Sequence, residues 1–144
     1  MNRRANIVAL LAALAFLPQL LAFRADKKPL NIKTAMTKLK DGLKAIETNA
    51  ADPKKHPQCL SGVLDLEDAV NGAKLSDPPL AGKQAKEERA AYVRDYRKAM
   101  IELQKDLLDL EAAVLDGDAE KIKAACDKVG SAQNAGHSKF NPRK

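Results

Sequence analysis

Apolar residues recur along this chain at alternating intervals of four and three residues, the spacing of one buried stripe on an α-helix. The first such segment covers about residues 31–47, where Asn31 stands at the position of a helix cap. Its apolar stripe is Ile32, Met36, Leu39, Leu43 and Ile46. The pattern predicts an amphipathic helix with one face in a core.

Three later segments repeat this pattern, at about residues 58–74, 86–115 and 119–140. Gly117 is placed to end the third helix, and Asp118 is placed to cap the fourth. The first and second helices, and the third and fourth, are joined by short connections, which makes these neighbours antiparallel. Because each helix has one narrow apolar stripe and a charged remainder, we predict an all-α fold, an up-down-up-down antiparallel four-helix bundle.

Residues 1–22 have the three-part pattern of a secretory signal peptide. A short basic start, Met1–Arg4, precedes an apolar run at Ile7–Phe16, and Ala22 is a small residue at a suitable cleavage point. The alternative is an uncleaved anchor over Ala5–Phe23, which is barely long enough to span a bilayer. Polar residues interrupt that stretch, so we expect cleavage, export to the periplasm and no membrane attachment afterwards.

The predicted organisation of the chain is therefore a signal peptide at residues 1–22, a linker at residues 23–30 and the bundle at residues 31–141. A chain of 144 residues, 45% of them apolar and 31% charged, supports one hydrophobic core rather than two lobes with a cleft between them. We expect a monomer.

The net charge of +6 is spread over alternating basic and acidic residues, and aromatic residues make up only 3% of the chain. Nucleic-acid binding needs a basic face with stacking aromatics, so no nucleic-acid partner is expected. No pair of carboxylates is placed for acid–base work and no nucleophile stands beside a base, so an enzyme is not expected either.

Met36 and His137 are the candidate residues for metal chemistry. In the predicted topology the start of the first helix and the end of the fourth share one end of the bundle, and both residues are expected to project toward the core there. A thioether facing an imidazole across a bundle could be an axial pair for haem iron. Taken singly, a Met on an apolar stripe is usually core packing, and a His near a helix end is usually a surface or capping residue.

Three aromatic residues gather at the same end. Tyr92 and Tyr96 open the third predicted helix and Phe140 closes the fourth. A flat macrocycle needs large apolar walls of this kind. The alternative is that these rings simply fill a splayed end of the bundle.

These residues resemble the cytochrome b562 family, whose fold is a four-helix bundle like that of cytochrome c′. The resemblance covers about residues 31–141. The string Met36–Glu47 matches the family segment that begins at its axial Met, and Pro78–Pro79 matches its loop between the second and third helices. Asp95–Arg97 matches the Asp-Phe-Arg of its third helix, and Asn134–His137 matches a string near the end of its fourth. In the family the last string reads Asn-Ala-Tyr-His and ends in the axial His.

The resemblance implies a periplasmic electron-transfer protein with a non-covalent b-type haem. Met36 and His137 would then ligate the iron. The residues implied to surround the haem are Ile32, Leu39, Tyr96, Met100, Gln133 and Phe140. A thioether-linked haem is not expected, since no Cys-x-x-Cys-His motif precedes His137. The redox partner is not identified by the sequence.

Departures from the family pattern leave an alternative open. Gln133 stands where the family has an Arg, Gly136 where it has an aromatic residue, and Met100 where it has a Phe. The pocket would be roomier and less cationic, with Lys33, Lys139 or Arg143 as candidate partners of a propionate. The alternative function is a haem-free, exported helical bundle that serves as an interaction or stress module.

Cys59 and Cys126 both lie on predicted buried stripes. Export to an oxidising compartment favours a disulfide between them. However, the second and fourth helices are diagonal in this topology, and a disulfide needs Cα atoms within about 7 Å. Two buried free thiols are the alternative.

Overall fold

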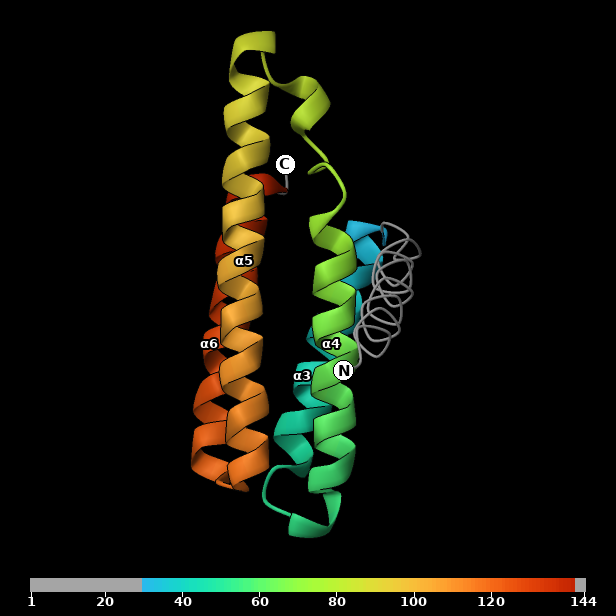
Figure 1. Ribbon diagram of the computed structural model, residues 1–144, viewed down its shortest axis with the longest axis vertical. Coiled ribbons are helices and arrows are strands. Elements are labelled where there is room, and N and C mark those ends of the chain that lie inside the picture. The colour runs from blue at the N-terminus through green and yellow to red at the C-terminus, as the bar shows by residue number, and fades with distance from the viewer. Residues whose placement is uncertain (1–29, 142–144) are drawn as a thin grey trace, which may run out of the picture.

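Four long helices and two short 3-10 helices form the part of the chain that the structure, a computed structural model, describes, residues 30–141 (Figure 1). The elements are α3 (Ile32–Asn49), η1 (Pro53–Lys55), α4 (His56–Lys74), η2 (Ala81–Lys83), α5 (Lys86–Asp116) and α6 (Ala119–Phe140). No strand occurs in this range. The predicted all-α four-helix fold is therefore confirmed, whereas the predicted signal peptide lies outside the described residues.

The helix ends follow the local chemistry of the sequence. The Asn31 side chain accepts a hydrogen bond of 2.9 Å from the Lys33 backbone N–H, and the Asp118 side chain accepts two at the start of α6. Gly117 ends α5 with a φ of 70°, the left-handed conformation that glycine adopts readily. These three predicted end signals are confirmed.

Two boundaries differ from the prediction by two residues, the end of α3, which continues to Asn49 instead of ending near Glu47, and the start of α4. Helix α4 begins at His56, two residues before the expected start at Gln58. Pro57 does not prevent this, because the first helical turn needs no backbone N–H donor and tolerates proline. The Asp52 side chain caps η1 directly before it by accepting a hydrogen bond from the Lys54 backbone N–H.

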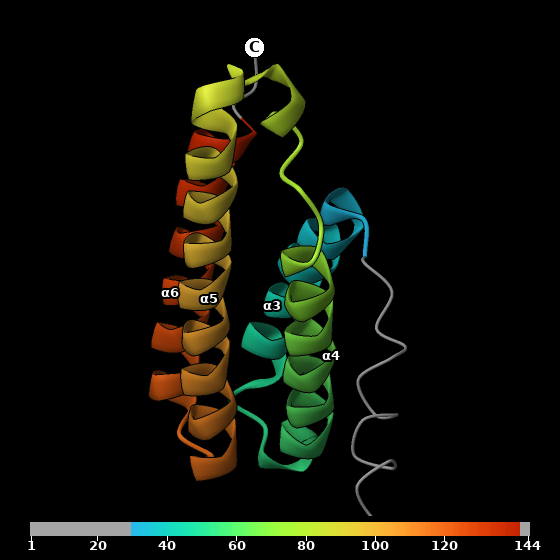
Figure 2. The ribbon, with the colours of Figure 1, turned by 45° about the horizontal axis from the view of Figure 1, so that its top comes forward.

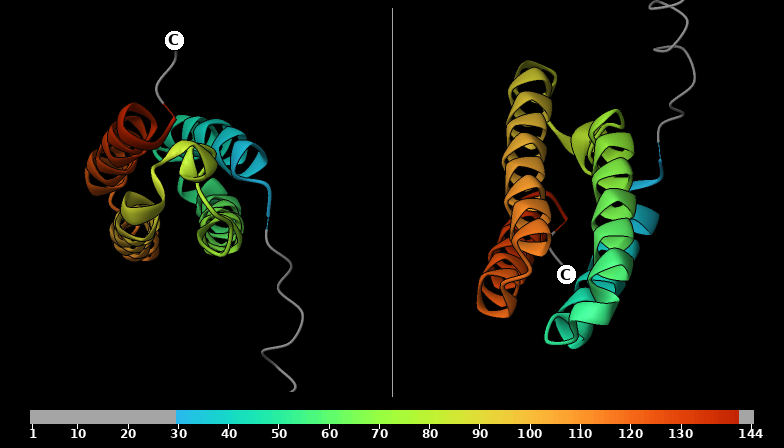
Figure 3. Two further views of the ribbon diagram at one scale, coloured as in Figure 1. Left: turned by 90° about the horizontal axis from the view of Figure 1, so that it is seen from above. Right: turned by 60° about the horizontal axis from the view of Figure 1, so that its bottom comes forward.

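The helices run antiparallel in chain order and stand at the four corners of a bundle (Figure 3, left). Helix α3 lies beside α4 and α6, and α5 lies beside the same two helices, so that α3–α5 and α4–α6 are the diagonal pairs. The connection from α4 to α5 passes through η2, as Figure 2 shows. Within residues 30–141, no helix is long and apolar enough to cross a membrane.

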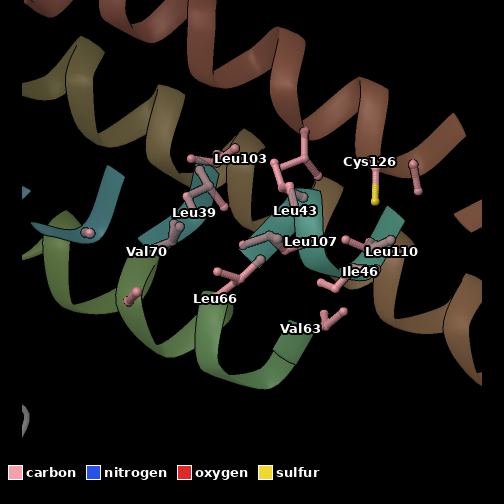
Figure 4. Close-up of a cluster of buried hydrophobic side chains, with 14 of the residues drawn as sticks. Leu39, Leu43, Ile46, Val63, Leu66, Val70, Leu103, Leu107, Leu110 and Cys126 are labelled. Carbon is pink, nitrogen blue, oxygen red and sulfur yellow. The ribbon is translucent and has the colours of Figure 1, made fainter. Parts of the chain in front are cut away.

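The predicted apolar stripes meet in a continuous core (Figure 4). Leu39, Val63 and Leu107 are fully buried, each with no exposed surface. The core fills the middle of the bundle and the end where α3 joins α4 and α5 joins α6. Among the described residues no polar or charged residue is fully buried, so the packing there is almost entirely apolar.

Cys59 and Cys126 are free thiols, both buried in this core. The structure therefore shows the alternative of two thiols and not the candidate disulfide, and the two residues lie on the diagonal pair α4 and α6. Burial raises the pKa of the Cys59 thiol and raises that of Cys126 to about 12. Both sulfurs are therefore protonated at neutral pH and behave as small apolar groups.

Candidate functional site

An open cavity of about 780 Å³ lies between α3, α5 and α6, at the end of the bundle where α3 begins and α6 ends. A volume in the range of about 300–1,000 Å³ is typical of sites that hold small molecules and cofactors. Most of the apolar lining comes from α3 and α5. The apolar residues around the cavity are Ile32, Met36, Pro79, Tyr96, Ala99, Met100, Leu103, Ala132 and Phe140.

The cavity exists because α6 changes character along its length. Cys126 and Val129 fill the core, but the next positions on that face are Gln133 and Gly136, which have no bulky apolar side chain. In addition, α3 and α6 touch each other less than the other neighbouring helices do. Large apolar side chains return to α6 only at Phe140, so this end of the bundle stays open.

Met36 on α3 and Gln133 on α6 are in direct contact at the edge of the cavity. The Gln133 Nε2 donates a hydrogen bond of 2.8 Å to the backbone carbonyl oxygen of Met36, and the same nitrogen lies 4.0 Å from the Met36 Sδ. Both residues are half-buried. The thioether is therefore sheltered by protein and borders the cavity at the same time.

His137 also borders the cavity, but it lies on the rim and is exposed. It follows Gln133 by four residues, which places it about 6 Å further along α6 than the level of Met36. The expectation that it projects into the core is wrong in this structure. The reason is that α3 begins at Ile32, about level with His137, so no further turn of α3 covers this side chain.

The three aromatic residues form one cluster beside the cavity. The ring of Phe140 lies 5.4 Å from that of Tyr92 and 5.5 Å from that of Tyr96, both in edge-to-face geometry. The Tyr96 hydroxyl donates to the Ala73 carbonyl at 3.0 Å, and the Tyr92 hydroxyl donates to the Phe140 carbonyl at 3.2 Å. Burial raises the pKa of Tyr96 to about 12, so this donor stays protonated. The aromatic wall is thus fixed by hydrogen bonds at both tyrosines.

The family model of cytochrome b562 matches residues 31–141, a range that contains all four long helices. The chain belongs to the cytochrome b562 family. Members of this family are non-enzymatic, haem-binding electron carriers and are typically periplasmic. Comparisons with curated proteins and with solved structures gave no match.

The residues around the cavity fit the b-type haem that membership of the cytochrome b562 family implies. A thioether and an imidazole border one space, aromatic and aliphatic side chains form its walls, and Lys33 and Lys40 stand on its α3 side. Gly136 adds room, because a Cβ placed there would meet no atom within 4 Å. In residues 30–141, no group of three or more His, Cys, Asp and Glu side chains could hold a metal ion.

Five of the six residues that resemblance to the cytochrome b562 family places around the haem border the cavity. They are Ile32, Tyr96, Met100, Gln133 and Phe140. Leu39 does not: it is fully buried in the core (Figure 4). The reason is its position further along α3 than Met36, where the side chains of all four helices already meet.

Sequence reasoning missed several residues on the cavity. Thr37, Lys40 and Asp41 line it from α3, and Leu103 lines it from α5. The helical spacing could have revealed the first two, since Lys33, Thr37 and Lys40 follow one another at intervals of four and three residues beside the apolar stripe.

Of the two candidate partners of a propionate that the structure describes, Lys33 borders the cavity and Lys139 does not. The Lys139 Nζ instead lies 3.2 Å from the Asp95 carboxylate and 5.3 Å from the centre of the Phe140 ring. Arg143 lies outside the described residues. Lys40, on the same side of α3 as Lys33, takes the place of Lys139 as a candidate.

Proposed function

We propose that this protein is a periplasmic one-electron carrier that binds b-type haem non-covalently, with Met36 and His137 as the axial ligands. The observation that carries the proposal is that these two side chains, far apart in the sequence, border the same cavity, which has an apolar and aromatic lining. Family membership supports haem binding and electron transfer. The signal-peptide pattern of residues 1–22 supports the periplasmic location.

Bound haem supplies the one-electron chemistry, the change of iron between the ferric and ferrous states. Met36 contributes a soft thioether sulfur, and Met/His ligation raises the reduction potential. His137 contributes an imidazole nitrogen from the rim. Lys33 and Lys40 are placed to pair with carboxylates.

The rest of the chain holds the walls of the cavity in place. Tyr96 and Phe140 form an edge-to-face pair beside the cavity, and Tyr96 is tied to the end of α4 through the Ala73 carbonyl. Below the cavity the apolar core joins all four helices. A scaffold of this kind limits rearrangement around the iron when its charge changes.

The deciding experiment is a haemin titration of the mature chain from Phe23, with spectra of the oxidised and dithionite-reduced forms. We expect a saturable one-to-one complex with sharp low-spin bands. In Met36→Ala and His137→Ala these bands should be lost or become high-spin. His56→Gln is the matched control, because His56 is the other of the two histidines in the sequence and lies at the opposite end of the bundle.

The exposure of His137 and the departures at Gln133 and Gly136 favour a second candidate function, a haem-free exported bundle used as an interaction or stress module. In that case the titration shows no saturable binding, or binding that is indifferent to both substitutions. Met36→Ala would then change only the free energy of unfolding, by about 2 kcal/mol, because Met36 is half-buried.

A further inference from the structure

Gln133 makes the contact that joins α6 to α3 beside the cavity. Its Nε2 donates to the Met36 carbonyl oxygen at 2.8 Å and lies 4.0 Å from the Met36 sulfur. The side chain is half-buried, and it reaches a residue that precedes it by 97 positions in the chain. A single amide therefore contacts both the backbone and the thioether of the proposed ligand.

The two helices have little else to hold them together at this end. They touch least among neighbouring helices, and the cavity separates their facing sides. Their other polar side-chain contact within residues 30–141 is the ion pair of Lys123 with Glu47, at 3.8 Å. That pair lies at the opposite end of the bundle and is exposed, so it contributes little to the register of the helices near Met36.

We propose that Gln133 is a positioning residue for Met36, an inference that rests on the proposed haem function. The hydrogen bond to the carbonyl fixes the height and rotation of α3 relative to α6, and so aims the thioether into the cavity. The same N–H group lies beside the sulfur and draws electron density from it. A sulfur that donates less density stabilises ferric iron less, so Gln133 raises the reduction potential.

The test compares Gln133→Leu and Gln133→Glu with the unchanged mature chain. Leucine removes the amide at similar bulk, and glutamate keeps the length but has no N–H donor at neutral pH. Ser131→Ala is the matched control, because Ser131 lies on the same helix, is exposed and does not border the cavity. Three quantities are measured: the haemin dissociation constant, the midpoint potential, and the NMR signals of the Gln133 amide and Met36 methyl group without haemin.

We expect haemin binding to weaken by about 10–100-fold in both Gln133 variants, the usual effect of losing a group that orients a metal ligand. The midpoint potential should fall in both, and the control should change neither quantity. A purely structural role would weaken binding and leave the potential unchanged, which overturns the proposal. Unchanged binding in Gln133→Leu also overturns it.

The haem-free measurement separates this inference from the proposed function. In the unchanged chain the Gln133 side-chain amide should exchange slowly with solvent, and the Met36 methyl signal should shift in Gln133→Leu but not in Ser131→Ala. If the unchanged chain binds no haemin but these signals behave as expected, the proposed function fails and the contact stands. If the amide exchanges at the rate of a free side chain, the positioning role fails by itself.

Discussion

The two ends of this bundle share the spacing of four and three residues, but one end is filled by side chains and the other holds a cavity. At the closed end, where α5 turns into α6, Leu110, Val114 and Ile122 are buried and belong to the continuous apolar core. At the cavity end, Gln133 and Gly136 occupy the corresponding face of α6, and a space of about 780 Å³ remains. A stripe at helical spacing therefore places a helix in a bundle, and the size of its side chains decides whether the bundle is filled.

The two ends also differ in how they are held. The closed end is held by apolar packing, by the turn at Gly117 and by a hydrogen bond of 2.9 Å between the His56 Nε2 and the Ala50 carbonyl. The cavity end relies on the aromatic cluster and on the amide of Gln133. The closed end should therefore contribute most of the stability, and the cavity end should bind the ligand.

The largest effect is expected from Leu107→Ala compared with Met100→Ala on the same helix. Leu107 is fully buried, so its truncation should leave a closed void and reduce the free energy of unfolding by about 2–5 kcal/mol. Met100 is also buried but borders the existing cavity, so its truncation should cost only about 2 kcal/mol, the low end of that range. Urea unfolding followed by circular dichroism measures both.

The same pair should show the reverse order in a haemin titration, with binding weakened more in Met100→Ala than in Leu107→Ala. Equal losses of stability in the two variants would contradict the division of the bundle into a packed end and an open end.

A second comparison uses one glycine from each end. Gly117 has a φ of 70°, and a Cβ there would lie 3.3 Å from the His56 Nδ1, so Gly117→Ala should destabilise the protein by about 1–2 kcal/mol. Gly136 is helical, and a Cβ at this position would extend into open space, so Gly136→Ala should stabilise by about 0.5–1 kcal/mol. Thermal unfolding of both variants checks these opposite signs, and a shift in the same direction would argue against them.

The smallest effect is expected at Glu67, whose carboxyl group lacks a hydrogen-bond partner at one oxygen. The Oε1 of Glu67 is buried without a hydrogen-bond partner, and burial, followed by the neighbouring Glu111 and Asp68, raises the pKa of Glu67. The folded protein therefore holds this proton more tightly than the unfolded chain does. Stability from this group is present below the ordinary glutamate pKa and is lost as the pH rises through the raised value.

Glu67→Gln should accordingly make the protein slightly more stable at neutral pH and flatten the dependence of the unfolding free energy on pH above about 4.5. Urea titrations across that range measure the effect. Asp65→Asn, at an exposed position on the same helix, is the control. If the slope of the unfolding free energy against pH is the same in Glu67→Gln as in the unchanged chain, the Glu67 carboxyl group is not buried as the structure indicates.

Much of the architecture follows from residues that act locally. The stripe spacing predicted four helices, and Asn31, Gly117 and Asp118 marked three of their ends correctly, because capping and left-handed turns depend on neighbours in the chain. The start of α4 was misjudged by two residues because a proline ends some helices and begins others.

The site was only partly open to the same reasoning. The sequence indicated that Met36 and His137 share one end of the bundle, and the structure places both on one cavity. It could not show that His137 stands exposed on the rim, that Leu39 lies in the core, or that Gln133 binds the Met36 carbonyl. The exposure of His137, the burial of Leu39 and the contact of Gln133 all depend on how the helices align lengthwise against one another.

By itself, then, the sequence determined the number and direction of the helices, three of their ends, and the residue types at each level of the bundle. Only the tertiary structure decided that the cysteines stay apart as free thiols, that α3 and α6 separate around a cavity, and that one amide bridges them. The physical reason is range: helix periodicity and capping act within a few residues, whereas packing depends on side chains that the chain brings together from distant positions.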